Sequence, residues 1–455
     1  MVFIIINLSC VNAVQNDNND FSSLNSEINN SSQLKTFNLT KDYVFNSEND
    51  GEYSSGITID IDDLIIDGQG HTINANNQAR IFNIQSNNVT LKNLVLINGF
   101  SDSQGAAVYW TGLNGEITNS TFKNSISKNI GGAVYFSNSA VVSDSKFINN
   151  SANFGGAVNL DNAIVTNCEF ENNFAKYLGG AIFCSQHSDI FNSTFRLNEA
   201  GDGGGIYFFT TGLVENTLFK RNNAIGYGGA ITNEGKTVIR NSTFIKNTGA
   251  YSGAIFLKGD GDIDNSIFNE NSAKAGGAID SYCDNTVIKN CIFNYNEAEK
   301  GKSLQIINKN IEIENATFNN NISYYESEIY MECNNPTLVN LTFNNITKQS
   351  ENTSNTPKII SKKKTTITAK TKTFKLKTKT KKYQITLKSG KTLLKNKKIT
   401  LKIKGKIYSA KTNNKGKATF KLKITKKGKF KAIIRFSGNK LYKASKKVIY
   451  IKIKK

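Results

Sequence analysis

Apolar and polar residues alternate in two short runs that recur along most of the chain. The first run follows a glycine pair, as in GGAVYF and GGAIFC, and places Val or Ile at 134, 158, 182, 206, 231, 255 and 279. The second run precedes an asparagine, as in TVIRNSTF, and places Ile or Val at 117, 142, 165, 190, 214, 239, 263 and 288. A period of two is typical of β-strands with one buried face. Each set of equivalent positions therefore predicts one stripe of a continuous core.

A phenylalanine marks every repeat and gives its length of 23 to 25 residues. These residues are Phe122, Phe147, Phe170, Phe195, Phe219, Phe244, Phe268, Phe293, Phe318 and Phe343. Three residues before them stand Asn119, Asp144, Asn167, Asn192, Asn216, Asn241, Asn265, Asn290, Asn315 and Asn340. A second asparagine follows the phenylalanine by three residues in most copies. Repeats of this length are typical of solenoids.

A parallel β-helix explains the repeat better than a leucine-rich horseshoe, because the second half of the repeat holds glycine and β-branched residues in place of a helical segment. In stacked coils, equivalent residues lie about 4.8 Å apart, so the same corner chemistry recurs in each coil. Asparagine tolerates the left-handed conformation of a corner, and stacked amides hydrogen-bond along the ladder. The glycine pair permits a bend and close approach of coils. We therefore predict that the Phe and Asn ladders are structural.

The same alternation extends to 57–73 and 81–99, which predicts a β-helix over 57–346 with about 11–12 coils. Residues 34–56 are expected to cap its first coil, after a polar linker at 14–33. The apolar start, 1–13, reads as a truncated secretory signal peptide, with a buried first strand as the alternative. A polar linker at 347–358 is expected to end the helix and to precede a second domain at 359–455. No stretch has the roughly 20 apolar residues of a membrane span.

The pairing of F-x-x-N with G-G-A-[IV] at this period resembles the repeat of the chlamydial polymorphic outer membrane proteins. That resemblance covers about residues 90–345 and implies a right-handed parallel β-helix at a cell surface. The bacterial relatives end in a membrane β-barrel, whereas this chain ends in a Lys-rich segment. With that segment, the chain resembles the adhesin-like surface proteins of methanogenic archaea.

The C-terminal segment reads as short alternating strands separated by turns such as Asn-Asn-Lys-Gly, which predicts a β-sandwich. Its KTNNKGKATFKL resembles the T-x-x-x-G-x-A-x-F signature of bacterial Ig-like domains in invasin-type surface proteins. The predicted fold class is therefore all-β: a right-handed parallel β-helix followed by an Ig-like sandwich.

Charge divides the chain at the same boundary. Residues 358–455 hold 36 Lys and Arg and no Asp or Glu, so the net +21 of the whole leaves 21 − 36 = −15 for the remainder. The lysines are explained either as a solubilising coat that protects sheet edges or as an electrostatic attachment to an anionic wall polymer. Nucleic acid is not an expected partner, because no aromatic stacking platform accompanies the lysines.

Catalysis on a β-helix needs paired carboxylates, or a calcium cluster with a basic residue. No register carries acids in successive coils. The acids considered are Asp202, Asp260, Asp262, Asp264, Asp280 and Asp284, and a further cluster, Asp60, Asp62, Asp63 and Asp67, is explained by an initiating turn. His71 and His187 are isolated, and the cysteines form no framework or metal motif. We expect no catalytic residue, cofactor or metal, with a pectate-lyase-like lyase or a hydrolase as the alternative.

One predicted outward register carries aromatic residues. Directly after the inward residue of the glycine-pair strand stand Tyr109, Tyr135, Phe183, Tyr207, Phe256 and Tyr330. Such a row either stacks on sugar rings or packs on itself across coils. The sequence therefore predicts a secreted, cell-surface or wall-associated protein that binds polysaccharide or a partner cell.

Overall fold

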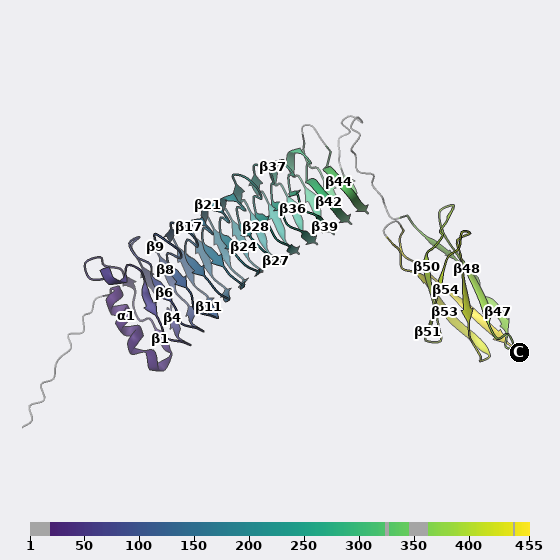
Figure 1. Cartoon of the computed structure of the whole chain (residues 1–455), viewed down its shortest axis with the longest axis horizontal. Helices are drawn as coiled ribbons and strands as arrows, with labels where there is room; N and C mark the ends of the chain where they lie inside the picture. Colours follow the sequence, from purple (N-terminus) through teal and green to yellow (C-terminus); the bar gives the residue numbers. More distant parts are fainter. Residues whose placement is uncertain (1–18, 324–326, 345–362, 440–441) are drawn as a thin grey trace, which may run out of the picture. The chain divides into compact units, whose positions relative to one another are not determined.

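The computed structural model describes residues 19–323, 327–344, 363–439 and 442–455. These residues belong to two compact units, the second built mainly from residues 358–455 (Figure 1). The predicted signal peptide at 1–13 and the predicted linker at 347–358 lie outside the described residues. The two units are described separately below.

The first unit is a parallel β-solenoid of about 12 turns, which confirms the predicted coil architecture. One coil holds β14 (Val134–Phe136), β15 (Ala140–Ser143), β16 (Lys146–Ile148) and β17 (Ser151–Phe154). Each strand pairs in parallel with its equivalent in the next coil, and those equivalents are β18 (Val158–Leu160), β19 (Ala163–Thr166), β20 (Glu169–Glu171) and β21 (Phe174–Leu178). Stacking of all coils produces sheets of 23, 13 and 9 strands.

The strands that follow the glycine pair form one row along the solenoid. Its members include β10 (Val108–Trp110), β14, β18, β22 (Ile182–Cys184), β26 (Ile206–Phe208), β30 (Ile231–Asn233), β34 (Ile255–Leu257) and β38 (Ile279–Ser281). The row continues into two longer strands, β42 (Leu304–Glu314) and β44 (Ile329–Val339). The last coil ends with β45 (Thr342–Asn344).

The repeated phenylalanines form a single stack inside the solenoid. From Phe122 to Phe343, neighbouring ring centroids lie 4.7 to 5.0 Å apart, with ring planes within 12° of parallel. The rings from Phe122 to Phe318 are fully buried. Each therefore contributes its burial from water, and every ring between the two ends of the stack also contacts two neighbouring rings.

The two glycines of each pair serve different purposes. The first has a positive φ, for example +67° at Gly179 and +65° at Gly203, a conformation that other residues rarely adopt. The second has no room for a side chain: a Cβ on Gly180 would lie 2.1 Å from the carbonyl oxygen of Gly204 in the next coil. Both reasons inferred from the sequence, a bend and close approach, are confirmed.

The asparagines before each phenylalanine occupy an outer corner in the left-handed conformation. Their φ values run from 44° to 56°, and Asp144 shares this conformation at 50°. Several of these amides donate to the preceding coil, including Asn119 to Asn93 Oδ1 at 2.7 Å and Asn265 to Asn241 Oδ1 at 2.8 Å. This outer ladder lies at the solvent-facing corner.

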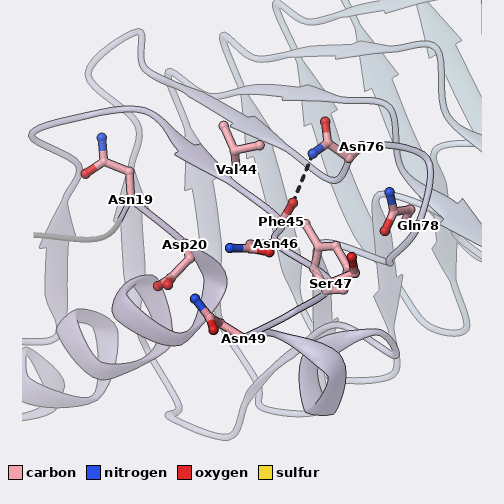
Figure 2. Close-up of a pocket in the computed structure, with 9 residues that line it drawn as sticks. All are labelled: Asn19, Asp20, Val44, Phe45, Asn46, Ser47, Asn49, Asn76 and Gln78. Carbon is pink, nitrogen blue, oxygen red and sulfur yellow. Dashed lines mark hydrogen bonds between the residues drawn. The ribbon is translucent and has the colours of Figure 1, made fainter. Parts of the chain in front are cut away.

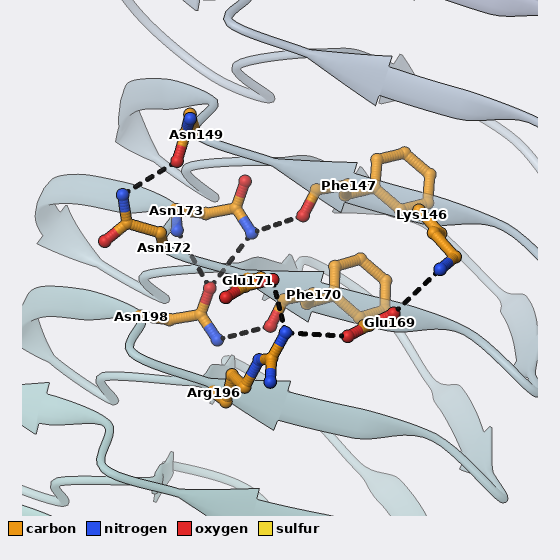
Figure 3. Close-up of polar contacts among 10 residues, drawn as sticks. All are labelled: Lys146, Phe147, Asn149, Glu169, Phe170, Glu171, Asn172, Asn173, Arg196 and Asn198. Atoms are coloured by element: carbon orange, nitrogen blue, oxygen red, sulfur yellow. Dashed lines mark hydrogen bonds and ion pairs between the residues drawn. The ribbon is translucent and has the colours of Figure 1, made fainter.

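A second, inner ladder is formed by the buried asparagines that follow most of the phenylalanines by three residues (Figure 3). Asn173 Nδ2 donates to the Phe147 carbonyl oxygen and to Asn198 Oδ1, both at 2.9 Å. Its Oδ1 accepts from the backbone N–H and the side-chain amide of Asn150 at 3.0 and 3.1 Å. One side chain thus satisfies four hydrogen bonds in the core, which removes the cost of burying its amide.

The N-terminal cap begins earlier than the sequence predicts. Residues assigned to a polar linker at 14–33 include helix α1 (Phe21–Asn30), whose Phe21, Leu24 and Ile28 are buried. Asp20 caps this helix through the Ser23 N–H, and the buried Asp50 accepts from the Phe21 and Ser22 N–H groups. Strands β1 (Thr36–Asn38) and β2 (Tyr43–Val44) then pair with the first full coil. These three apolar residues lie 3 and 4 positions apart, which is the spacing of an amphipathic helix. The segment is polar in its overall composition, so a prediction from composition alone gives a linker.

The C-terminal unit consists of two sheets around one apolar core. One sheet holds β46 (Thr366–Thr368), β48 (Lys381–Ser389), β49 (Thr392–Leu393) and β52 (Lys417–Leu422). The other holds β47 (Lys372–Lys375), β50 (Lys398–Ile403), β51 (Lys406–Lys411), β53 (Gly428–Phe436) and β54 (Ser445–Lys454). Ala418 and Phe420 are buried in the shared core, as the sequence predicts.

Candidate functional site: an aromatic and acidic surface on the solenoid

The predicted aromatic register lies on the row of strands after the glycine pair, but it is not a uniformly outward row. Tyr109, Tyr135, Phe183, Phe256 and Tyr330 are half-buried, whereas Tyr207 is only 5% exposed. Asn159, Thr232, Asp280 and Gln305, at the same register in other coils, are buried. The expectation of a solvent-facing row is therefore wrong for about half of its positions.

Residues that lead into the next glycine pair cover this register. Phe154, at the end of β17, packs on Phe183 with ring centroids 5.9 Å apart, and Tyr227 packs on Phe256 at 4.4 Å. A period-two pattern identifies which side chains share a face of a strand. It cannot show that residues from another part of the repeat pack over that face. The predicted site residues thus pack against aromatic rings that the sequence analysis did not single out.

Two groups of rings make up what we call the aromatic surface. The first contains Phe154, Tyr177, Phe183 and Tyr207, and the second contains Tyr227, Tyr251, Phe256 and Tyr282. Tyr177, Tyr251 and Tyr282 are each 43–46% exposed, so both groups reach solvent. Tyr109 and Tyr135 form a separate stacked pair at 5.4 Å, with the Arg80 guanidinium 5.1 Å from the Tyr109 ring centroid. Tyr330 instead contacts Lys300 and Glu332.

Carboxyl groups lie beside the first aromatic group. Burial raises the pKa of Asp202, although the Tyr227 N–H donates to its Oδ1 at 2.7 Å. A hydrogen bond from Lys258 Nζ lowers the pKa of Glu234, and Glu234 also bonds to the Tyr207 hydroxyl. The negative charge of Glu234 adds to the rise in the pKa of Asp202, so the two carboxyls lie within reach of an electrostatic interaction. They come from different registers, which is why a search for acids at one register missed Glu234.

Asp280 lies beside the second aromatic group and is 1% exposed. Gln305 Nε2 donates to Asp280 Oδ1 at 3.0 Å and to the Tyr282 hydroxyl at 2.9 Å. Burial raises the pKa of Asp280 to about 8, although Lys300 opposes the shift. Within the described part of the chain, neither Asp280 Oδ2 nor Gln305 Oε1 has a hydrogen-bond partner. Unpaired buried polar atoms are unusual in native folds and require an explanation.

The other acids considered in the sequence serve the coil structure. Asp260 accepts from the backbone and side chain of Asn285 at 2.9 and 3.0 Å. Asp264 accepts from Asn290 Nδ2 at 2.6 Å, and Asp284 pairs with Lys309. Asp67 accepts from the Gln69 N–H at 3.0 Å, in the turn that the sequence indicates. Among the described residues, no three His, Cys, Asp or Glu side chains are grouped so that they could hold a metal ion.

A pocket of about 460 Å³ lies at the N-terminal end of the solenoid (Figure 2). Its lining includes Asn19, Asn46, Asn49 and Gln78, all exposed, and Asn76 Nδ2 donates to the Phe45 carbonyl oxygen at 2.9 Å. These contacts belong to the cap around α1. The pocket offers exposed amides but no buried group in need of a partner.

Of the helices in the described ranges, none has both the length and the apolar character needed to cross a membrane.

One family model matches a short part of the chain. Residues 167–185 match the family described as the Chlamydia polymorphic membrane protein repeat. No curated protein sequence matches the chain.

Similar solved structures include two mutants of the tailspike protein of E. coli bacteriophage HK620, one in complex with pentasaccharide and one that also carries a two-residue deletion. They are 13% and 12% identical with TM-scores of 0.41 and 0.39, and each comparison covers 94% of this chain and 88% of the tailspike. ORF18 of Geobacillus virus E2 is 11% identical over 91% of this chain and 68% of its own, with a TM-score of 0.26.

Proposed function

We propose that this protein is an extracellular or cell-surface carbohydrate-binding solenoid whose aromatic surface contacts an extended glycan. The observation that carries this proposal is the run of half-exposed rings over successive coils, with carboxyl and amide groups among them. Aromatic faces stack on the apolar faces of sugars, while a few polar groups fix their orientation. Exposed rings grouped in one strip are also more typical of an interaction surface than of the scattered apolar residues found on most protein surfaces.

The finer expectations form part of the same proposal. The repeat match and the coil architecture support an adhesin-like role at a cell surface, in which the solenoid presents its aromatic surface to a wall polysaccharide or a partner cell. The two-sheet core of the C-terminal unit supports an Ig-like module, and its lysines support attachment to an anionic polymer. A right-handed coil and an archaeal source follow from the resemblance alone.

Binding of the full chain to a panel of immobilised neutral and acidic oligosaccharides tests the proposal. Phe183→Ala and Tyr227→Ala remove one ring from each aromatic group and should each weaken binding about tenfold, the effect of roughly 1.4 kcal/mol. Tyr295→Ala is the matched control, because Tyr295 is 55% exposed but takes part in neither aromatic group. Absence of binding by the unmodified chain, or equal losses in all three variants, would overturn the proposal.

A hydrolytic reaction is the second candidate, favoured by Asp202 and Glu234. Their environments move the two pKa values in opposite directions, as in pairs where one carboxyl donates a proton and the other acts as base or nucleophile. Release of new reducing ends from a bound polysaccharide tests it. Asp202→Asn and Glu234→Gln should each abolish that release while binding persists; release that survives both substitutions excludes this pair.

A further inference from the structure

The second aromatic group contains two buried polar atoms that the fold does not satisfy. Phe256, Asp280 and Gln305 occupy one register in three successive coils, so their side chains emerge on the same face of β34, β38 and β42. Asp280 is 1% and Gln305 is 3% exposed, yet Asp280 Oδ2 and Gln305 Oε1 lack partners among the described residues. Leaving such atoms unpaired costs stability, which a core of apolar residues would avoid.

Exposed aromatic rings lie beside this pair. Tyr282 is 46% exposed, its hydroxyl accepts from Gln305 Nε2, and its ring lies 5.8 Å from that of Phe256. Phe256 packs in turn on Tyr227, and Tyr227 stacks on the exposed Tyr251 at 4.9 Å. Aromatic walls around a small number of polar groups are typical of binding sites for small polar ligands.

We propose that Asp280 and Gln305 form the polar floor of a sugar subsite walled by Tyr227, Phe256 and Tyr282, and that this subsite takes a neutral sugar residue. The inference rests on the proposed carbohydrate-binding function and assigns its ligand class and its specificity-determining residues. In this site, one sugar hydroxyl accepts a hydrogen bond from the Asp280 carboxyl and donates one to Gln305 Oε1.

The protonation of Asp280 selects this ligand class. With the pKa of Asp280 raised to about 8, the carboxyl is mostly protonated at pH 7, so its second oxygen carries a donor. Gln305 Oε1 is an acceptor. A hydroxyl group both donates and accepts, and therefore satisfies the two atoms together. A uronate carboxylate only accepts, so it would leave Gln305 Oε1 without a donor.

Tyr282 controls access to the pair. Both unpaired oxygens are shielded from solvent, and the Tyr282 hydroxyl holds the Gln305 amide. A sugar hydroxyl reaches the floor when the Tyr282 side chain swings outward and its ring moves onto the sugar face. Rotamer changes of exposed side chains take nanoseconds or less, so this movement does not limit the rate of binding.

Affinity of the full chain for three probes tests the subsite: cello-oligosaccharides, N-acetylglucosamine oligomers and oligogalacturonate, measured by titration at pH 7. We expect binding of at least one neutral probe and none of the uronate. Asp280→Leu and Gln305→Leu should each weaken that binding about tenfold, since each removes a hydrogen bond to the ligand without opening a cavity. Asp280→Asn retains one donor and one acceptor and should stay within about threefold of the original affinity.

Two further variants separate ligand contact from damage to the fold. Tyr282→Phe keeps the ring and removes the hydroxyl that competes for Gln305, so affinity should be unchanged or about threefold tighter, whereas Tyr282→Ala should lose about tenfold. Asp284→Leu makes the same chemical change at an exposed carboxylate and should have no effect. Thermal unfolding of every variant checks that the solenoid is intact.

The outcomes distinguish the subsite from the general function. Neutral-sugar binding that survives Asp280→Leu and Gln305→Leu overturns the subsite and leaves the aromatic surface as the binding site. Preference for oligogalacturonate overturns the assigned ligand class. Failure of the unmodified chain to bind any of these probes or the wider oligosaccharide panel overturns the proposed function, and the subsite with it.

Discussion

At the residue scale, two asparagines in the same repeat perform unlike tasks although they are one position apart. Asn172 lies at an exposed corner with φ of 56° and donates to Asn149 Oδ1 at 2.7 Å (Figure 3). Asn173 is 1% exposed and makes the four buried hydrogen bonds of the inner ladder. The backbone conformation explains the first residue, and polar satisfaction in the core explains the second.

This difference predicts unequal effects of substitution. Asn173→Ala removes the hydrogen bond to the Phe147 carbonyl and three more to Asn150 and Asn198, and should lower the free energy of unfolding by about 3 kcal/mol or more. Asn172→Gly removes one exposed hydrogen bond, and glycine adopts positive φ without strain, so the loss should stay below about 1 kcal/mol. Denaturant unfolding of both variants measures the two losses. Equal losses would contradict the distinction between buried and corner asparagines.

The raised pKa of Asp280 leads to a prediction of how the free energy of unfolding depends on pH. Its folded pKa of about 8 lies above the 3.8 of an unperturbed Asp, so over the interval between them the folded state holds a proton that the unfolded state has released. This group's contribution is complete below the unfolded pKa and is lost as pH rises through the folded pKa, with a slope of about −1.4 kcal/mol per pH unit between the two pKa values. Between about pH 5 and 7.5, Asp280→Asn should flatten the decline and stabilise the protein most at the upper end.

Melting temperatures at several pH values measure this effect. The control is Asp284→Asn, because its carboxylate is exposed and lies outside the buried pair. A pH dependence that is unchanged in Asp280→Asn would show that other groups cause it.

At the element scale, the coil depends on close backbone contact at the second glycine of each pair. A Cβ on Gly180 would lie 2.1 Å from one carbonyl oxygen and 2.7 Å from another, and neither backbone atom can move without shifting a coil. Gly180→Ala should therefore destabilise the solenoid by about 3 kcal/mol or prevent folding. Gly51→Ala is the control, since no heavy atom lies within 4 Å of its added Cβ, and it should change stability by under about 0.5 kcal/mol. Thermal unfolding compares them, and a tolerated Gly180→Ala would refute the close-contact explanation.

The repeat allowed the solenoid to be predicted because each coil reproduces the same side-chain pattern, which fixes strands, corners and core together. Helix α1 and the covered aromatic register escaped prediction for a shared reason. α1 occurs once, so no repetition reinforces its three buried residues, and the covering of Phe183 by Phe154 depends on the bend between two strand rows. Glu234 was missed for a related reason. It stands at a different position of the repeat from Asp202, so a search for acids at one position in successive coils does not pair the two.

At the scale of the whole molecule, charge is arranged in a way that stability alone does not explain. In the C-terminal unit, Lys429 lies opposite Lys452, and Arg435 lies opposite Lys446, on paired strands β53 and β54. Like charges directly opposite each other in a sheet are destabilising. Residues 358–455 contain no acid that could offset this repulsion from within the unit. A polyanionic partner would relieve it, whereas a solubilising coat would require no such density.

The last prediction separates these two explanations. If the C-terminal unit attaches the protein to an anionic polymer, many weak contacts screened over about 8 Å at physiological ionic strength should dominate binding. Retention of the full chain on immobilised poly-glutamate should then fall steeply as salt rises from about 50 to 500 mM. Replacement of Lys429, Lys431, Lys446 and Lys452 by Gln should shift elution to lower salt, because these residues are exposed on the five-stranded sheet.

A matched control removes the same amount of charge from the solenoid, by changing Lys123, Lys128, Lys220 and Lys274 to Gln. Salt-independent retention, or equal shifts in both variants, would show that the C-terminal lysines are a solubilising coat.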